Sequence, residues 1–230
     1  RVDADGDSIT QSATVDLISH STLEGYGESQ EGGVSNTSYF SFDDDGPDAN
    51  AKAQASAGTT LDETAGLDTA VISAASITGL FDAPAYGADG EGFTRYSLSA
   101  TDGAATNLWL TGQSGADNEI HLIKISATQY EGHVGTTVGG ALAFTISINS
   151  VTGAVTVQQN ATLEHLEDGA AHDDSLSLSG AAAISVTQTV TDGDGDTDSA
   201  TSGSALSIVF KDDGPDANAK AQASAGTTLD

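Results

Sequence analysis

The chain has 230 residues, and its 34 acidic side chains outnumber its 6 basic ones, for a formal net charge of −28. Such a charge disfavours nucleic acid and anionic membrane surfaces as partners and favours divalent cations. Cysteine is absent, which excludes disulfides, thiolate metal sites and thiol nucleophiles. Hydrophobic residues make up 37% of the chain and recur in periodic runs, which predicts a folded protein over a disordered acidic tail.

An acidic motif opens the chain in the segment VDADGDS, which carries Asp3, Asp5 and Asp7. Carboxylates at alternate positions of a glycine-containing loop can turn inward around one hard cation, and Ca²⁺ takes roughly six to eight oxygen ligands. We therefore predict calcium as the cofactor. Residues 1–41 are interpreted as the C-terminal part of a preceding repeat, with an independent small sheet as the alternative.

A 21-residue segment then occurs twice in the chain. Residues 42–62 read FDDDGPDANAKAQASAGTTLD and residues 210–230 differ from them only by Lys211 in place of Asp43, at a spacing of 168 residues between Gly46 and Gly214. This spacing exceeds the roughly 20–50 residues of a solenoid repeat and suits one whole domain. We predict an acidic linker at 42–48, a complete repeat at 49–210, and a second linker with the truncated start of another repeat at 211–230.

The complete repeat shows the period-2 hydrophobic pattern of β-strands. In GALAFTISINSVTGAVTVQQ, two alternating runs flank a turn at Gly153, which predicts a hairpin. In NEIHLIKIS the pattern changes phase between Leu122 and Ile123, which indicates either a bulge or a strand buried on both faces. Many short strands, few prolines and no sustained helical period predict an all-β fold, a β-sandwich.

A second acidic loop lies near the end of the repeat, in VTDGDGDTDSA. Its acids are Asp192, Asp194, Asp196 and Asp198. An EF-hand is excluded, because position 12 counted from Asp192 is Gly203 and no helices flank the loop. The acids of the two DDGPD linkers are further candidate ligands: Asp43, Asp44, Asp45, Asp48, Asp212, Asp213 and Asp216. The alternatives are a solvated turn and a hydrophilic linker without metal.

A series of segments in the chain resembles a known protein family. In order along the chain they are LDET, YGADGEGFTRYSL, GGALAFTISINSVTGAVTV, VTDGDGDTDSA and FKDDGPDA. Over about residues 48–216 it resembles the repeat domain of giant repeats-in-toxin (RTX) adhesins, which Gram-negative bacteria secrete by the type I pathway. The resemblance implies immunoglobulin-like sandwiches in tandem, stiffened by Ca²⁺ near their junctions. It extends the ligand roles to Glu63 of LDET and Asp89 of YGADG. The chain has no Gly-Gly-x-Gly-x-Asp runs, so type I secretion is implied by resemblance alone.

We expect a structural extender on the cell surface that projects a ligand-binding region for adhesion or biofilm formation. Its expected partners are neighbouring repeats of the same chain, and we expect a monomer. A calcium-dependent carbohydrate- or protein-binding module is the alternative, with Trp109 or Tyr86 as stacking platforms. An enzyme is not expected, because the acids and histidines of LEHLEDGAAHDD lack an accompanying nucleophile motif.

Overall fold

The structure is a computed structural model that describes residues 9–13, 38–42, 45–165 and 174–211. The chain forms two compact units. The first comprises Arg1–Asp48, Pro84–Phe93 and Val190–Asp198, and the second comprises Ala49–Ala83, Thr94–Thr189 and Ser199–Asp230.

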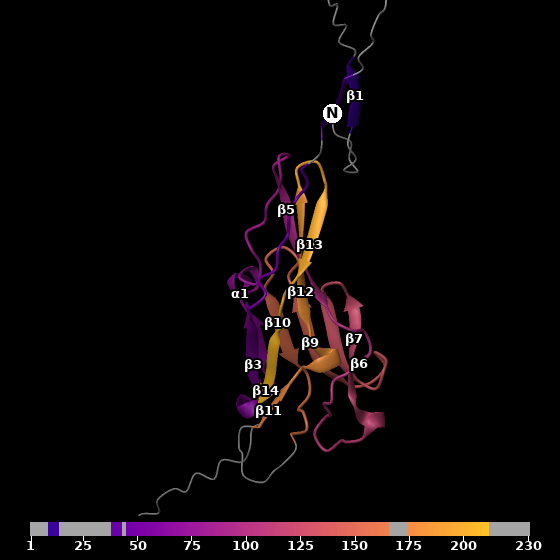
Figure 1. The fold of residues 1–230 in the computed structure, drawn as a ribbon. Coiled ribbons are helices and arrows are strands. Elements are labelled where there is room, and N and C mark those ends of the chain that lie inside the picture. The colour runs from indigo at the N-terminus through magenta and orange to yellow at the C-terminus, as the bar shows by residue number, and fades with distance from the viewer. Residues whose placement is uncertain (1–8, 14–37, 43–44, 166–173, 212–230) are drawn as a thin grey trace, which may run out of the picture. The chain divides into compact units, whose positions relative to one another are not determined.

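Strands dominate the described residues (Figure 1). They are β1 (Ile9–Ala13), β2 (Ser38–Phe42), β3 (Gly58–Asp62), β4 (Thr69–Ile72), β5 (Glu91–Ser99), β6 (Ala104–Ala105), β7 (Ile120–Ser126), β8 (Gln129–Val134), β9 (Leu142–Ile148), β10 (Val155–Gln159), β11 (Ser175–Ser177), β12 (Ser185–Asp192), β13 (Thr197–Thr201) and β14 (Ser207–Lys211). The described helices are short: α1 (Ala74–Thr78) and three 3₁₀ turns, η1 (Glu63–Ala65), η2 (Ala116–Asn118) and η3 (Gly180–Ala182). Within these ranges, no helix has the length and apolarity needed to cross a membrane.

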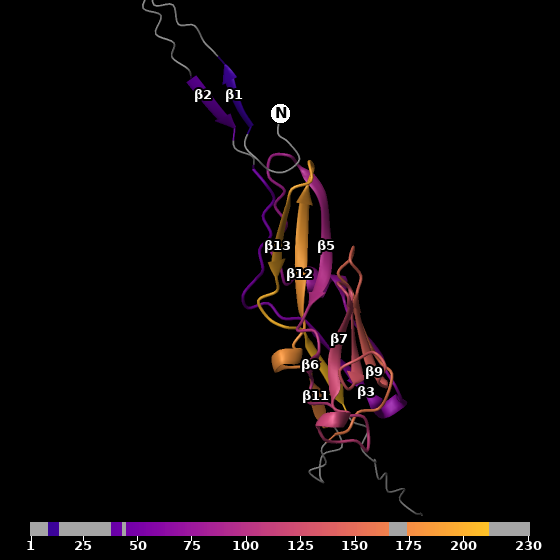
Figure 2. The same cartoon turned by 90° about the vertical axis from the view of Figure 1, so that its right-hand side faces the viewer.

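The sheets form an all-β sandwich, which confirms the predicted fold class. One sheet has the order β4-β10-β9-β8-β7-β6, and two smaller sheets have the orders β11-β14-β3 and β13-β12-β5 (Figures 1 and 2). Side chains from different sheets meet in one apolar core, in which the rings of Phe144 on β9 and Phe210 on β14 lie 5.4 Å apart between centroids. Burial of this core is the main stabilising contribution to the fold.

The predicted hairpin is confirmed by the pairing of β9 with β10. The two strands are antiparallel, with Val155 opposite Ile148 and Val157 opposite Ile146, and all four side chains are buried. Gly153 adopts a φ of +79° in the turn between them, where a residue with a side chain would be strained.

Strand β7 differs from the sequence-based expectation. Ile120 and Leu122 point into the core, and Ile123 is only half-buried, so the strand keeps its alternation through the predicted phase change. The register irregularity lies instead between Lys124 and Ser126, where β7 leaves the core and its residues are exposed. Both earlier interpretations, a bulge at Leu122 and Ile123 and burial on both faces, were therefore wrong.

The N-terminal segment contributes one strand pair. Strands β1 and β2 are antiparallel, with Ile9 opposite Phe42 and Ala13 opposite Ser38. Strand β2 thus includes Phe42, the first residue of the predicted linker. Further along, the linker residue Asp48 forms an antiparallel bridge with Ala85: the Asp48 amide donates to the Ala85 carbonyl at 2.9 Å, and the reverse bond measures 3.2 Å.

Candidate metal centre

The acidic loop after β12 is a tight turn that Asp192 organises. Its Oδ1 accepts hydrogen bonds from the backbone amides of Gly195 at 3.0 Å and Asp196 at 2.8 Å, and its own amide donates to the Asp196 carbonyl at 3.1 Å. Gly195 has a φ of +112°, a conformation that favours glycine. In this D-x-x-G-D turn, one carboxylate oxygen of Asp192 accepts the hydrogen bonds that close the turn, and the other oxygen takes no part in them.

A second loop, residues 84–90, brings Asp89 to this turn. Glycines permit the close approach: a Cβ atom on Gly193 would lie 2.3 Å from the Asp89 carbonyl oxygen, and one on Gly92 would lie 2.0 Å from that of Asp192. Contacts this short to backbone atoms exclude any side chain at either position unless the loops move apart.

The two loops together assemble three carboxylates. Asp89, Asp192 and Asp194 each offer one oxygen, and these three oxygens lie within 4.8 Å of one another. Among the residues that the structure describes, this is the group of acids and histidines arranged closely enough to share a metal ion. Asp89 and Asp194 are exposed, and Asp192 is only 3% exposed.

The buried carboxylate carries the clearest chemical signal. Asp192 Oδ2 is buried and has no hydrogen-bond partner among the described residues. An anionic oxygen without a donor is costly to bury, and buried charges in proteins are paired or coordinate metals. A cation between the three acids would provide the missing partner.

The turn favours the ionised form of Asp192. Burial opposes its charged form, but the backbone amides of the turn, among them those of Gly195 and Asp196, donate hydrogen bonds that outweigh burial and hold the pKa of Asp192 below its ordinary value. A metal ligand must be deprotonated, so this loop keeps Asp192 ready to bind across the neutral pH range.

The donor set fits a hard cation such as Ca²⁺. All three side chains offer carboxylate oxygens, and Ca²⁺ binds oxygens at roughly 2.3–2.6 Å, so two ligands on opposite sides of one ion are about 5 Å apart. Oxygens within 4.8 Å of one another agree with that span. Softer metals prefer imidazole or thiolate ligands, which this group lacks.

Comparison with protein families gives one match. A family model described as a domain of unknown function, DUF5801, matches residues 58–203. The chain belongs to the DUF5801 family. The matched part of this DUF5801 domain includes Asp89, Asp192 and Asp194. The comparisons with curated proteins and with solved structures find no match.

Several of the predicted ligands lie outside this group. Asp196 contributes its backbone to the turn, and Asp198 lies on β13. Asp45 and Asp48 are exposed in the linker. The remaining linker and N-terminal acids lie outside the described residues: Asp3, Asp5, Asp7, Asp43, Asp44, Asp212, Asp213 and Asp216.

Glu63 occupies a different kind of environment. It is 8% exposed, and its Oε1 accepts hydrogen bonds from Gln159 Nε2 and, at 3.1 Å, from the Leu163 amide. These bonds tie η1 to the segment that follows β10. Glu63 Oε1 thus already accepts two hydrogen bonds. The metal-binding role of Glu63 stays a prediction.

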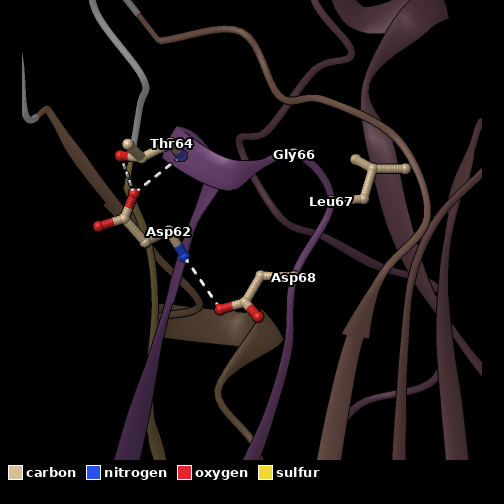
Figure 3. Close-up of a pocket in the computed structure, with 5 residues that line it drawn as sticks. All are labelled: Asp62, Thr64, Gly66, Leu67 and Asp68. Atoms are coloured by element: carbon tan, nitrogen blue, oxygen red, sulfur yellow. Dashed lines mark hydrogen bonds between the residues drawn. The ribbon is translucent and has the colours of Figure 1, made fainter.

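A second acidic turn of the domain was not singled out from the sequence. Asp62, Thr64, Gly66, Leu67 and Asp68 line a hollow of about 330 Å³ (Figure 3). Figure 3 shows the Thr64 hydroxyl and amide directed at Asp62 Oδ1, the amide at 2.9 Å, and the Asp62 amide directed at Asp68 Oδ2 at 3.4 Å. Asp68 Oδ1 accepts from the Thr69 amide at 2.7 Å. The D-x-T pattern is the signal that identifies such a turn in a sequence.

The residues of the alternative functions have local structural roles. Trp109 is half-buried, and its indole N–H donates to the Gly115 carbonyl at 2.8 Å. Glu164 accepts from the Gly112 amide through Oε2, and His165 is buried. The first bond lies within the loop that contains η2, and the Glu164 bond joins that loop to the segment after β10.

Proposed function

We propose that this DUF5801 domain is a calcium-binding extender repeat of an RTX-like adhesin on the surface of a Gram-negative bacterium. The observation that carries the proposal is the group of three carboxylates formed by Asp89, Asp192 and Asp194, in which Asp192 has a buried Oδ2 that lacks a donor among the described residues. Asp89, Asp192 and Asp194 would hold the ion, and the ion would supply a cross-link between the two loops that carry them.

The charge of the chain supports calcium as a structural element. Three carboxylates gathered in one place repel each other, and the formal net charge of −28 adds to that repulsion. Extracellular calcium modules have dissociation constants of roughly 10⁻⁴–10⁻³ M, so such a site fills outside the cell and stays largely empty in the cytosol. At a free concentration 100 times the dissociation constant, one ion adds about 2.7 kcal/mol to the free energy of unfolding.

The loop that carries Asp89 also holds the linker that enters the repeat. Ala85 pairs with the Asp48 backbone, and a Cβ atom on Gly87 would lie 1.7 Å from the Asp45 carbonyl oxygen. An ion bound at Asp89 fixes the far end of this loop, so calcium would also restrain residues 45–48. Repeats joined by restrained linkers make an extended rod that can project a distant ligand-binding region.

A calcium titration followed by small-angle X-ray scattering tests the extender function. We expect the maximum dimension of the chain to increase and its flexibility to fall from excess chelator to millimolar Ca²⁺. The Asp192→Asn variant, which keeps the size of the side chain but removes its charge, should show no such change. Identical scattering of the unaltered chain in chelator and in calcium would contradict the proposal.

A further inference from the structure

We infer that strands β3 and β14 form a mechanical clamp, the pair of strands that resists tension applied along the chain. Both strands belong to the second compact unit, whereas the candidate metal site lies in the first. The inference therefore goes beyond the proposed function and does not depend on an ion. It assigns the domain a further function, which is to bear mechanical load.

The two strands are neighbours in one sheet although they are far apart in the sequence (Figure 1). Among the described strands of this unit, β3 comes first along the chain and β14 comes last. They are parallel, with Gly58 opposite Ser207 at one end of the pair and Asp62 opposite Lys211 at the other. The chain therefore enters the pair at Gly58 and leaves it at Lys211, at the opposite end.

Tension along the chain pulls these two strands past each other. Entry and exit are separated by about 13 Å along the strands, whereas neighbouring strands lie only about 4.8 Å apart. The force is thus directed mainly along the strands, and it loads the evenly spaced hydrogen bonds of the parallel pair at the same time. Forced unfolding is governed by the unfolding rate, and bonds that must break together make that rate low.

Further contacts oppose the sliding of β3 along β14. The Ser207 amide donates to the Ala57 carbonyl at 2.9 Å, directly before the pair begins. Leu61 on β3 is fully buried in the core, so any displacement of the strand exposes its apolar side chain to water. On its other side, β14 pairs with β11, which leaves β3 as the strand that must move.

Single-molecule force spectroscopy of the full chain tests the clamp. The chain has no cysteine of its own, so introduced cysteines define the two pulling points. Ser56→Cys with Lys211→Cys pulls at opposite ends of the strand pair, and Ser56→Cys with Ser207→Cys pulls at the same end. Ser56 and Ser207 are exposed and Lys211 is half-buried, so these handles leave the apolar core intact.

The two handle pairs should differ in rupture force, measured in millimolar Ca²⁺. We expect a force roughly two- to five-fold higher for opposite-end pulling, because five residue pairs share the load that same-end pulling places on one pair at a time. Rupture should release the 155 residues between Ser56 and Lys211 in one step of about 500 Å, at roughly 3.4 Å per residue. Equal forces for the two handle pairs would overturn the inference.

A substitution inside the clamp should weaken it. A Cβ atom on Gly58 would lie 2.4 Å from the Ser207 carbonyl oxygen, so Gly58→Ala should lower the opposite-end rupture force toward the same-end value. Gly139→Ala is the matched control, because a Cβ atom there would make only an ordinary contact of 3.6 Å with Thr137. Equal rupture forces in these two variants would contradict the clamp.

A substitution at the candidate metal site separates the clamp from calcium. Asp192→Asn removes the charge of the proposed ligand, and we expect the opposite-end rupture force in Ca²⁺ to stay unchanged. If the force instead falls to the same-end value, the ion carries the load. That outcome would overturn the clamp and would leave the proposed calcium site standing.

Discussion

Two acidic turns of this protein use their carboxylates in opposite ways. In the Asp62–Asp68 turn, Asp62 Oδ1 accepts from Thr64, and both oxygens of Asp68 accept from backbone amides. In the Asp192–Asp196 turn, Asp192 Oδ1 accepts from two amides, but Oδ2 is buried without a donor among the described residues. In the part of the chain that the structure describes, the second turn is the one whose carboxylate lies close enough to others, those of Asp89 and Asp194, to share an ion.

The difference shows that acidic composition does not define a metal site. A carboxylate whose oxygens are bonded to nearby N–H groups stabilises its own turn and has little left for an ion. In a carboxylate of the Asp192 kind, the hydrogen bonds to one oxygen fix the orientation of the group. The other oxygen is buried without a donor and can bind an ion. We therefore propose calcium binding at the Asp192 turn and a structural role for the Asp62 turn.

Neutralising Asp192 should have the largest effect on calcium binding. Asp192→Asn removes the charge of the buried ligand, and we expect calcium affinity to fall by roughly 100-fold or more in a calorimetric titration. Asp62→Asn is the matched control and should leave the affinity unchanged. Equal losses in the two variants would remove the distinction between the turns.

Moving the two loops apart should have the next largest effect. Gly193→Ala places a methyl group against the Asp89 carbonyl while keeping all three carboxylates, and we expect a roughly 10- to 100-fold loss of calcium affinity, because ligand orientation changes. Gly66→Ala is the control from the other turn, since a Cβ atom on Gly66 would meet nothing within 4 Å. Unchanged affinity in Gly193→Ala would show that Asp89 is not a ligand.

Removing the Asp62 side chain should affect stability but not calcium binding. Asp62→Ala leaves the Thr64 hydroxyl and amide without their acceptor, and we expect the melting temperature to fall by roughly 2–4 °C. The fall should be the same in calcium and in chelator. A larger fall in calcium would mean that this turn also binds the ion.

Acid titration gives the smallest difference between the turns. The Thr64 side chain and amide, and the charge of Lys211, lower the pKa of Asp62 against the opposing effect of burial, and the pKa of Asp192 is also lowered. A lowered folded-state pKa stabilises the protein above the ordinary value of about 3.9 and loses that contribution as pH falls through the folded value.

In chelator, the unfolding free energy should therefore decrease as pH falls below about 4. In Asp62→Ala, the unfolding free energy should depend less steeply on pH in this range. Urea unfolding at a series of pH values measures this dependence. A slope that is unchanged by the substitution would contradict the assignment of the lowered pKa to folded-state bonds.

Local patterns predicted much of the fold and part of the site. The alternation at Phe144, Ile146, Val155 and Val157 predicted the central hairpin, because buried faces follow the period of a strand. The same rule missed Gln188, which takes an inward position on β12 and is only 1% exposed, with its Nε2 bonded to the Tyr96 hydroxyl at 3.2 Å. A polar residue in an apolar row depends on a partner 92 residues away, which periodicity cannot show.

The site required tertiary information for a similar reason. The DGDGD motif identified Asp192 and Asp194, but the spacing alone suggested that all four alternate acids would surround one ion. Asp89 joins them from a loop more than 100 residues earlier, and its inclusion came only from the family resemblance. Which oxygens remain without donors depends on turn hydrogen bonds that the sequence does not specify.

The most direct test of the calcium assignment is a thermal melt of the unaltered chain in millimolar Ca²⁺, in Mg²⁺ and in excess chelator. We expect a rise in melting temperature of roughly 5–10 °C with Ca²⁺ and little change with Mg²⁺, which is smaller and binds fewer ligands in a stricter geometry. Coincident melts in all three conditions would contradict it and would make the Asp192 turn a solvated acidic loop.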